Sequence, residues 1–139
     1  EVVNLSRAGA NLAVALRGIQ STQFADGIVL IEIGGNDLIS NPPTPPAEFE
    51  ARLHQLLERA TTGGGPVAMF ELPLLPGQMA YGRIQRSLAQ RHKVILIPRR
   101  YLVSILATPG ATLDGIHLSA EGHKRMAAMV WELIGDSFR

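Results

Sequence analysis

The chain has 139 residues, of which 46% are hydrophobic, and this length suits one compact domain with a buried core. Lysine and arginine total 13 against 12 aspartate and glutamate residues, so the net charge of +1 disfavours nucleic-acid binding. Cysteine is absent from the sequence, which excludes disulfides, thiolate nucleophiles and cysteine metal sites. We expect a soluble protein, since no apolar stretch approaches the roughly 20 residues of a membrane span and no targeting signal indicates a compartment.

Predicted strands and helices alternate along the chain. Residues 2–5 form a short β-branched run that predicts a strand, and Leu12, Leu16 and Ile19 then recur at helical spacing. Residues 27–35 are almost all apolar, which is typical of a strand covered on both faces. Further helices are expected over 47–62, 79–91, 99–107 and 120–134, and Ser119 is expected to cap the last one. Further strands are expected over 67–72 and 93–98, and a proline-rich loop over 41–46.

This alternation has a consequence for the position of a ligand site. Apolar strands joined by single helices predict a parallel sheet with helices on both faces. Ligands bind such sheets beyond the carboxyl ends of the strands. The candidate loops are therefore residues 6–11, 34–46, 73–81 and 108–117.

The first candidate motif is "IGGND", residues 33–37, at the end of the most hydrophobic strand. The paired glycines Gly34 and Gly35 would let the backbone bend under a ligand, while the Asn36 amide directs an N–H group at a developing negative charge. An ordinary turn is the alternative, because glycine, asparagine and aspartate are common turn residues.

The second motif, "DGIHLSAEGH", places Asp114 three residues before His117. An aspartate at this spacing can hydrogen-bond the imidazole Nδ1–H and leave Nε2 free as a general base. The alternative is a surface loop in which Asp114 and Gly115 make a turn and His117 has no role.

The remaining histidines indicate no metal site. His117 and His123 are six residues apart, which is not the i, i+4 spacing of a helical metal-binding pair. His123 is expected on the face of the last helix, and His54 and His92 are assigned no function.

Taken together, the two motifs resemble those of the SGNH, or GDSL-type, esterase and lipase superfamily over nearly the whole chain. The resemblance implies an α/β fold, a three-layer α/β/α sandwich with a flavodoxin-like parallel sheet. It implies that Asp114 and His117 are the acid and base, and that Asn36 contributes to the oxyanion hole. The segment "NLSRAGAN" looks like the block whose glycine, here Gly9, adds a backbone N–H to that hole.

The same resemblance implies supporting roles for two neighbours of Asn36. Gly35 and Asp37 would hold the loop in place. No metal or cofactor is required.

The chain departs from the family pattern at the nucleophile. Members open with a Gly-Asp-Ser block directly after the first strand, and none of the seven serines here follows a buried strand in that context. Ser6 comes nearest, but it precedes Gly9 within the block that should follow the nucleophile. The serines are Ser6, Ser21, Ser40, Ser87, Ser104, Ser119 and Ser137.

The departure also affects the sheet. The family order 2-1-3-4-5 would place the missing first strand between residues 2–5 and 27–35, so that both segments face an empty position. We therefore expect residues 1–139 to be a single SGNH hydrolase-like domain that is incomplete at its N-terminus. An upstream segment or a second chain would supply the strand and the serine.

Two classes of function follow. The first is a serine esterase or lipase that hydrolyses acyl esters of small molecules, lipids or carbohydrates, with the apolar loop at residues 72–81 either lining an acyl channel or belonging to the core. The alternative is a non-catalytic binding or scaffold domain of the same fold. A flavodoxin-like nucleotide binder is disfavoured, because no glycine-rich phosphate loop follows a strand.

Overall fold

The structure is a computed structural model that describes residues 2–24 and 27–135. The chain divides into two compact units, Glu1–Leu96 and Ile97–Arg139. Ser137, one of the seven serines, lies outside the described residues, as does Glu1. The expectation of a single domain stays a prediction.

The helices of the first unit follow its apolar periodicity. They are α1 (Leu12–Gly18), α2 (Gly35–Ile39), α3 (Pro46–Ala60) and α4 (Met79–His92), with a short 3-10 turn at Thr61–Gly63. The side chain of Asn11 caps α1 by accepting a hydrogen bond from the Val14 amide at 3.0 Å. The three long helices confirm the predictions, whereas the five-residue α2 was not predicted because it is too short to show a period.

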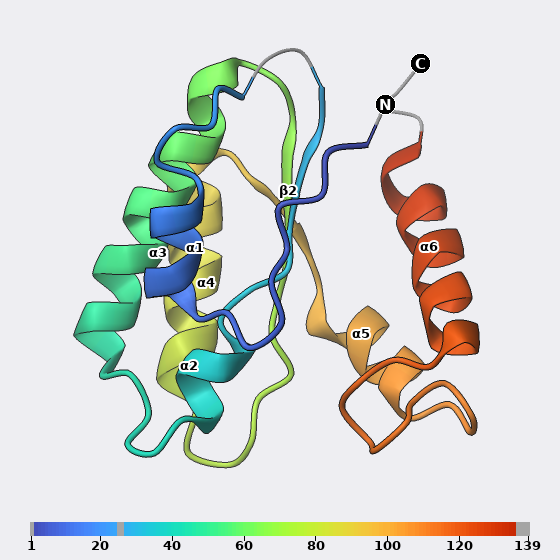
Figure 1. Cartoon of the computed structure of the whole chain (residues 1–139). Helices are drawn as coiled ribbons and strands as arrows, with labels where there is room; N and C mark the ends of the chain where they lie inside the picture. The colour runs from blue at the N-terminus through green and yellow to red at the C-terminus, as the bar shows by residue number, and fades with distance from the viewer. Residues whose placement is uncertain (1, 25–26, 136–139) are drawn as a thin grey trace. The chain divides into compact units, whose positions relative to one another are not determined.

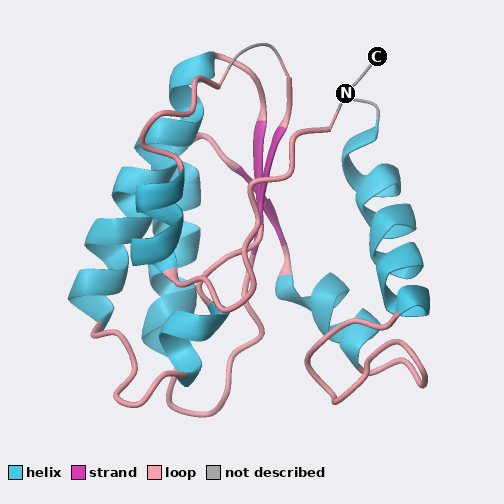
Figure 2. Cartoon of the chain, viewed as in Figure 1, coloured by secondary structure: helices cyan, strands magenta, loops and turns pink. Residues whose placement is uncertain are grey.

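The sheet has three strands in the order β1-β2-β3, namely β1 (Val29–Ile31), β2 (Val67–Phe70) and β3 (Ile95–Ile97) (Figure 2). β1 and β2 are parallel, with Val29 opposite Val67 and Ile31 opposite Met69. The parallel sheet with intervening helices confirms the predicted α/β class, with one strand fewer than the sequence suggested.

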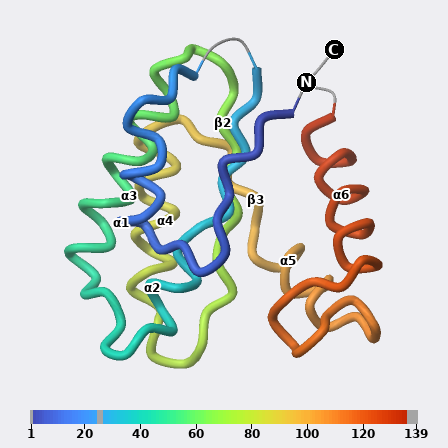
Figure 3. The backbone as a smooth tube through the Cα atoms, viewed as in Figure 1, coloured from blue at the N-terminus to red at the C-terminus, as the bar shows by residue number. Residues whose placement is uncertain are grey.

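The core of the first unit lies between one face of the sheet and the helices α1, α3 and α4 (Figures 1 and 3). Each of these helices contributes large apolar side chains that are almost fully buried, and the strands contribute their alternate residues. The principal members are Leu12, Ile31, Phe49, Leu53, Leu57, Val67, Met69 and Leu88. This packing fixes the strand ends and the loops that follow them.

Two strand predictions were wrong. Residues 2–5 form no strand, and Val2 is 93% exposed. A strand persists only when its backbone groups pair with a neighbour, and no described segment pairs with residues 2–5. The strand predicted over 27–35 spans only Val29–Ile31, and Leu30 is 46% exposed because it points away from the helix-covered face.

The second unit contains α5 (Arg99–Leu106) and α6 (Ala120–Ile134), joined by a loop over residues 107–119. Ser119 caps α6 as predicted, since its hydroxyl accepts a hydrogen bond from the Gly122 amide at 3.1 Å. A Cβ at Gly122 would lie 2.0 Å from the Ala111 carbonyl oxygen, so the first turn of α6 rests directly on the loop backbone. The loop that carries Asp114 and His117 is therefore anchored to the start of the helix.

Candidate active site

The turn from β1 into α2 depends on one glycine of the predicted pair. Gly34 precedes α2 with a φ of 104°, and a Cβ there would lie 3.0 Å from Leu72 Cδ1 and 3.1 Å from the Phe49 ring. Only glycine fits this conformation in this space. Gly35 is the first residue of α2 and has no atom near the position of a Cβ, so the bend belongs to Gly34 alone.

Asn36 and Asp37 both bind the segment that leads into α1. The Asn36 side-chain amide donates to the Ala10 carbonyl oxygen at 2.9 Å. Asp37, which is fully buried, accepts a hydrogen bond from the Leu12 amide at 2.8 Å. The structure thus brings together the two blocks that sequence reasoning singled out in the first half of the chain.

Gly9 lies immediately before this contact. It is exposed, has a φ of 70°, and has no atom within 4 Å of the position of a Cβ. Within the described part of the chain its backbone N–H makes no hydrogen bond. The Asn36 amide has a second hydrogen beyond the one given to Ala10, so both groups have a donor available to a ligand.

Sequence reasoning missed Thr44, which it placed in a proline-rich loop and gave no role. Its hydroxyl donates to Asp37 Oδ1 at 3.0 Å, and its amide donates to the Asp37 carbonyl oxygen at 2.9 Å. One signal was present in the sequence, since Thr44 stands alone between two pairs of prolines.

In the second unit, Asp114 and His117 form the predicted pair. His117 Nδ1 lies 2.7 Å from Asp114 Oδ2, and the two side chains are 76% and 55% exposed, respectively. The other carboxylate oxygen, Oδ1, accepts hydrogen bonds from the amides of His117 and Ile116 at 2.8 and 3.0 Å. Oδ1 therefore forms the turn that the alternative interpretation expects, and Oδ2 holds the imidazole.

These contacts affect the acidity of the carboxyl group. The His117 backbone N–H, then the His117 side chain and the Ile116 N–H, lower the pKa of Asp114 to about 2. Each of these donors stabilises the ionised form. The carboxylate is therefore charged at neutral pH.

The loop around the pair is closed at its base. Thr112 and Leu118 form an antiparallel bridge, and the Leu113 amide donates to the His117 carbonyl oxygen at 2.8 Å. Ser119 donates from its hydroxyl to the Gly110 carbonyl oxygen at 2.6 Å. These contacts hold together the two ends of the loop that carries the pair.

The other histidines have no part in this pair. His54 Nδ1 lies 2.7 Å from His92 Nε2, a contact between α3 and α4 to which sequence reasoning gave no role. His123 lies in the first turn of α6, with Nδ1 2.8 Å from the Ser119 carbonyl oxygen. Among residues 2–24 and 27–135, no group of three or more histidine, aspartate or glutamate side chains is arranged to hold a metal ion.

The candidate residues fall in both units. Gly9, Asn36 and Asp37 belong to the first unit, and Asp114 and His117 to the second. Asn36, Asp114 and His117 lie in segments that the sequence places beyond the carboxyl ends of the strands, and a meeting of the three side chains there is a prediction.

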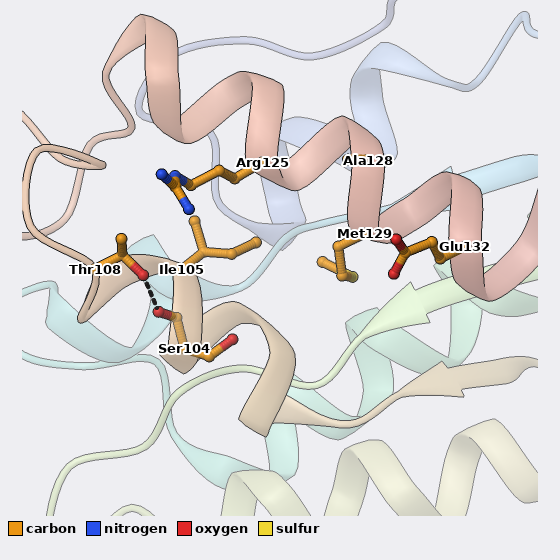
Figure 4. A pocket seen from close by; sticks show the side chains of 7 residues that line it. All are labelled: Ser104, Ile105, Thr108, Arg125, Ala128, Met129 and Glu132. Carbon is orange, nitrogen blue, oxygen red and sulfur yellow. Dashed lines mark hydrogen bonds between the residues drawn. The ribbon is translucent and has the colours of Figure 1, made fainter.

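A hollow of about 320 Å³ between α5 and α6 contains none of these residues (Figure 4). Ile105 and Met129 form its apolar part. Two of its polar side chains have partners, since Thr108 donates to the Ser104 carbonyl oxygen at 2.8 Å and Arg125 forms an ion pair with Glu121 at 3.0 Å.

Comparison with known proteins identifies the family. Residues 1–125 match the GDSL-like lipase/acylhydrolase family. The chain belongs to this family. No curated protein sequence matches this GDSL-like chain. The described part of the chain contains no helix that is both long and apolar enough to cross a membrane.

Solved structures confirm the fold of this family. TesA shares 25% identity and superposes with a TM-score of 0.80 over 99% of this chain and 79% of its own. The esterase EstA from Pseudoalteromonas sp., in a structure inhibited by monoethylphosphonate, shares 15% identity with a TM-score of 0.70, over 91% of this chain and 74% of its own. AlinE4, an SGNH-hydrolase family esterase, shares 21% identity with a TM-score of 0.63, over 94% of this chain and 73% of its own. The predicted superfamily and sandwich fold are therefore confirmed, and hydrolase activity of the esterase type is supported at the level of the family.

Proposed function

We propose that this chain supplies the acid, the base and the oxyanion hole of a serine esterase of SGNH type. The observation that carries the proposal is the 2.7 Å contact between His117 Nδ1 and Asp114 Oδ2. With the carboxylate on Nδ1, the imidazole presents Nε2 as a base. The nucleophilic serine comes from an upstream segment or from a second chain.

In this mechanism the serine Oγ attacks the acyl carbonyl carbon while His117 Nε2 takes the hydroxyl proton. Asp114 stabilises the resulting imidazolium. His117 then returns the proton to the departing alkoxide, which leaves as the alcohol. Water attacks the acyl-enzyme by the same route, which releases the acid and restores the serine.

Asn36 and Gly9 hold the negative charge of the tetrahedral intermediate. The bond from Asn36 to the Ala10 carbonyl oxygen fixes the amide and leaves one N–H for the oxyanion. The Gly9 N–H, unpaired within the described residues, supplies a second donor. Asp37 supports the Gly9 segment by fixing the Leu12 amide, and Gly35 starts the helix that carries Asn36.

The substrates we propose are acyl esters of small molecules, lipids or carbohydrates. Leu75, in the apolar loop after β2, and Met79, the first residue of α4, are 62% and 47% exposed, which leaves both side chains free to contact an acyl chain. No metal or cofactor takes part in the proposed reaction.

The test is hydrolysis of a p-nitrophenyl ester series of increasing acyl length by a form of the protein that carries the Gly-Asp-Ser segment. His117→Ala should abolish nearly all turnover, because the serine then lacks its base. Asn36→Ala should lower kcat by about 10²–10³. His123→Ala is the matched control, since it removes an exposed imidazole outside the pair, and it should retain the parent rate.

A binding or scaffold domain is the second candidate. It is favoured by the described serines of the second unit, because Ser104 and Ser119 donate to backbone carbonyl oxygens rather than to His117. Absence of ester hydrolysis in the serine-bearing form would support this candidate. An Asn36→Ala variant with unchanged kcat would show that residues 33–37 are only a turn.

A further inference from the structure

Residues 42–46, in the proline-rich loop between α2 and α3, contain a single backbone hydrogen-bond donor. Residues 42–46 read Pro-Pro-Thr-Pro-Pro, and proline has no N–H, so Thr44 alone can donate from the main chain. Thr44 is also 9% exposed, although it lies in a loop. Thr44 is therefore the one residue of this segment whose backbone N–H can bond to the rest of the protein.

All three polar groups of Thr44 have partners in the first unit. Its amide donates to the Asp37 carbonyl oxygen at 2.9 Å and its hydroxyl donates to Asp37 Oδ1 at 3.0 Å. Its carbonyl oxygen accepts a hydrogen bond from the Tyr81 hydroxyl at 2.7 Å. Thr44 thus connects Asp37 to α4.

Tyr81 gives this connection a rigid support. It is buried, and its ring meets the Phe49 ring edge to face with centroids 5.1 Å apart. Phe49 in turn lies against Gly34, where a Cβ would come within 3.1 Å of its ring. Gly34, just before α2, and Thr44, in the loop after it, therefore both contact the Phe49–Tyr81 aromatic pair.

The carboxylate of Asp37 depends on Thr44 for one of its two oxygens. Asp37 is fully buried, Oδ2 takes the Leu12 amide and Oδ1 takes the Thr44 hydroxyl. A buried carboxylate that loses a donor is strongly destabilised, so it turns toward another partner or toward water. Either movement would shift the Leu12 amide and the segment that begins at Gly9.

We propose that Thr44 is a positioning residue for the oxyanion hole and acts through Asp37. This inference rests on the proposed function, in which Gly9 and Asn36 donate to the oxyanion. Thr44 does not touch the substrate. The Thr44 hydroxyl holds the Asp37 carboxylate, and this carboxylate holds the Gly9–Leu12 segment. Thr44 thereby sets the distance between the Gly9 N–H and the Asn36 side-chain amide.

The experiment compares Thr44→Val and Thr44→Ser in the serine-bearing form, with a p-nitrophenyl ester as substrate. Valine keeps the branched shape and the backbone N–H but lacks the hydroxyl, whereas serine keeps the hydroxyl. Thr44→Val should lower kcat by roughly tenfold to a hundredfold with KM changed less than about twofold, because a misplaced oxyanion donor affects the transition state more than substrate binding. Thr44→Ser should retain most of the parent kcat. Tyr81→Phe should lower kcat by a smaller factor than Thr44→Val does.

A second measurement separates this inference from the proposed function. Hydrogen exchange of the Leu12 amide and the NMR signals of the Asn36 side-chain amide report the geometry of the first unit without any turnover. Thr44→Val should speed exchange at Leu12 and shift the Asn36 signals, and Thr44→Ser should do neither.

The outcomes are distinct. If the parent protein hydrolyses no ester, the proposed function fails. The role of Thr44 in an oxyanion hole then fails as well, whatever the NMR signals show. If the parent is active, a Thr44→Val variant with parent kcat overturns the inference. A Thr44→Ser variant no better than Thr44→Val also overturns it, as does parent-like Leu12 exchange in Thr44→Val.

Discussion

At the scale of single residues, the two oxygens of the Asp114 carboxylate have separate tasks. Oδ1 takes the amides of Ile116 and His117, which closes the turn, and Oδ2 takes the imidazole. The turn and the acid–base pair are therefore compatible interpretations of the same residue. The backbone and imidazole donors stabilise the ionised form of this exposed carboxylate and so lower its pKa further.

This division predicts the titration of Asp114. Its pKa, lowered to about 2 from an ordinary 3.8, should appear as the midpoint of the side-chain carboxyl signal in an NMR titration. In His117→Ala the midpoint should rise but stay below the ordinary value, because the two backbone donors remain. Since the folded pKa is lowered, the stabilisation is present above about pH 4 and is lost as the pH falls through 2.

The control for this titration is His123→Ala, which removes an imidazole outside the pair and should leave the midpoint near 2. A parent chain in which Asp114 titrates at the ordinary value would contradict the hydrogen bonds described above.

At the scale of secondary-structure elements, α2 depends on how it begins. Gly34 is in the left-handed region with Leu72 and Phe49 against it, whereas Gly35 has ordinary helical dihedrals and open space. Gly34→Ala should therefore lower the free energy of unfolding by about 2–3 kcal/mol. Gly35→Ala is the matched control and should leave it unchanged or raise it by up to about 1 kcal/mol.

Urea unfolding of the two variants measures this difference. Equal free energies of unfolding for Gly34→Ala and Gly35→Ala would show that the turn does not require a positive φ.

The contact between α3 and α4 predicts a second effect at this scale. Burial, then the charges of His54 and Arg91, lower the pKa of His92 below 6.5, and Glu58 opposes the shift. The folded state therefore binds a proton less readily than the unfolded chain. This contribution to stability is complete above about pH 6.5 and is lost as the pH falls below it.

His92→Gln should make the free energy of unfolding less dependent on pH between about 7.5 and 5. The control His123→Gln, on the exposed face of α6, should keep the parent dependence. Urea unfolding midpoints measured across this pH range test the prediction. An equal pH dependence of the free energy of unfolding in the parent and in His92→Gln would refute it.

The elements also show which features a sequence reveals. Helices α3, α4 and α6 were predictable because their apolar residues recur at a fixed period, and the Asp114–His117 pair because its members are three residues apart. The contact of His54 with His92 joins residues 38 apart, and no local pattern marks it. The absent strand at residues 2–5 shows the converse, since β-branched residues favour a strand only where a neighbour pairs with it.

At the scale of the whole molecule, no described segment pairs with the outer edge of β1. In the order β1-β2-β3 this strand pairs with β2 alone among the described residues, while Val2, Val3 and Leu5 are exposed. An unpaired edge beside exposed apolar residues favours association with another strand. The position corresponds to the strand that the family resemblance places between residues 2–5 and 27–35, directly before the nucleophile.

We therefore predict that a fluorophosphonate probe will not label residues 1–139 by themselves, because the proposed function takes the serine that His117 activates from outside them. The unpaired edge of β1 should also make this chain prone to aggregation. Addition of a segment with a strand and a Gly-Asp-Ser turn should restore both solubility and labelling, since the strand completes the sheet and delivers the serine to the base. Mass spectrometry of the labelled protein should locate the probe on the added serine, and the same segment with alanine in place of that serine should restore solubility without labelling. Stoichiometric labelling of residues 1–139 without the segment, at any of their own serines, would show that the nucleophile lies within this chain.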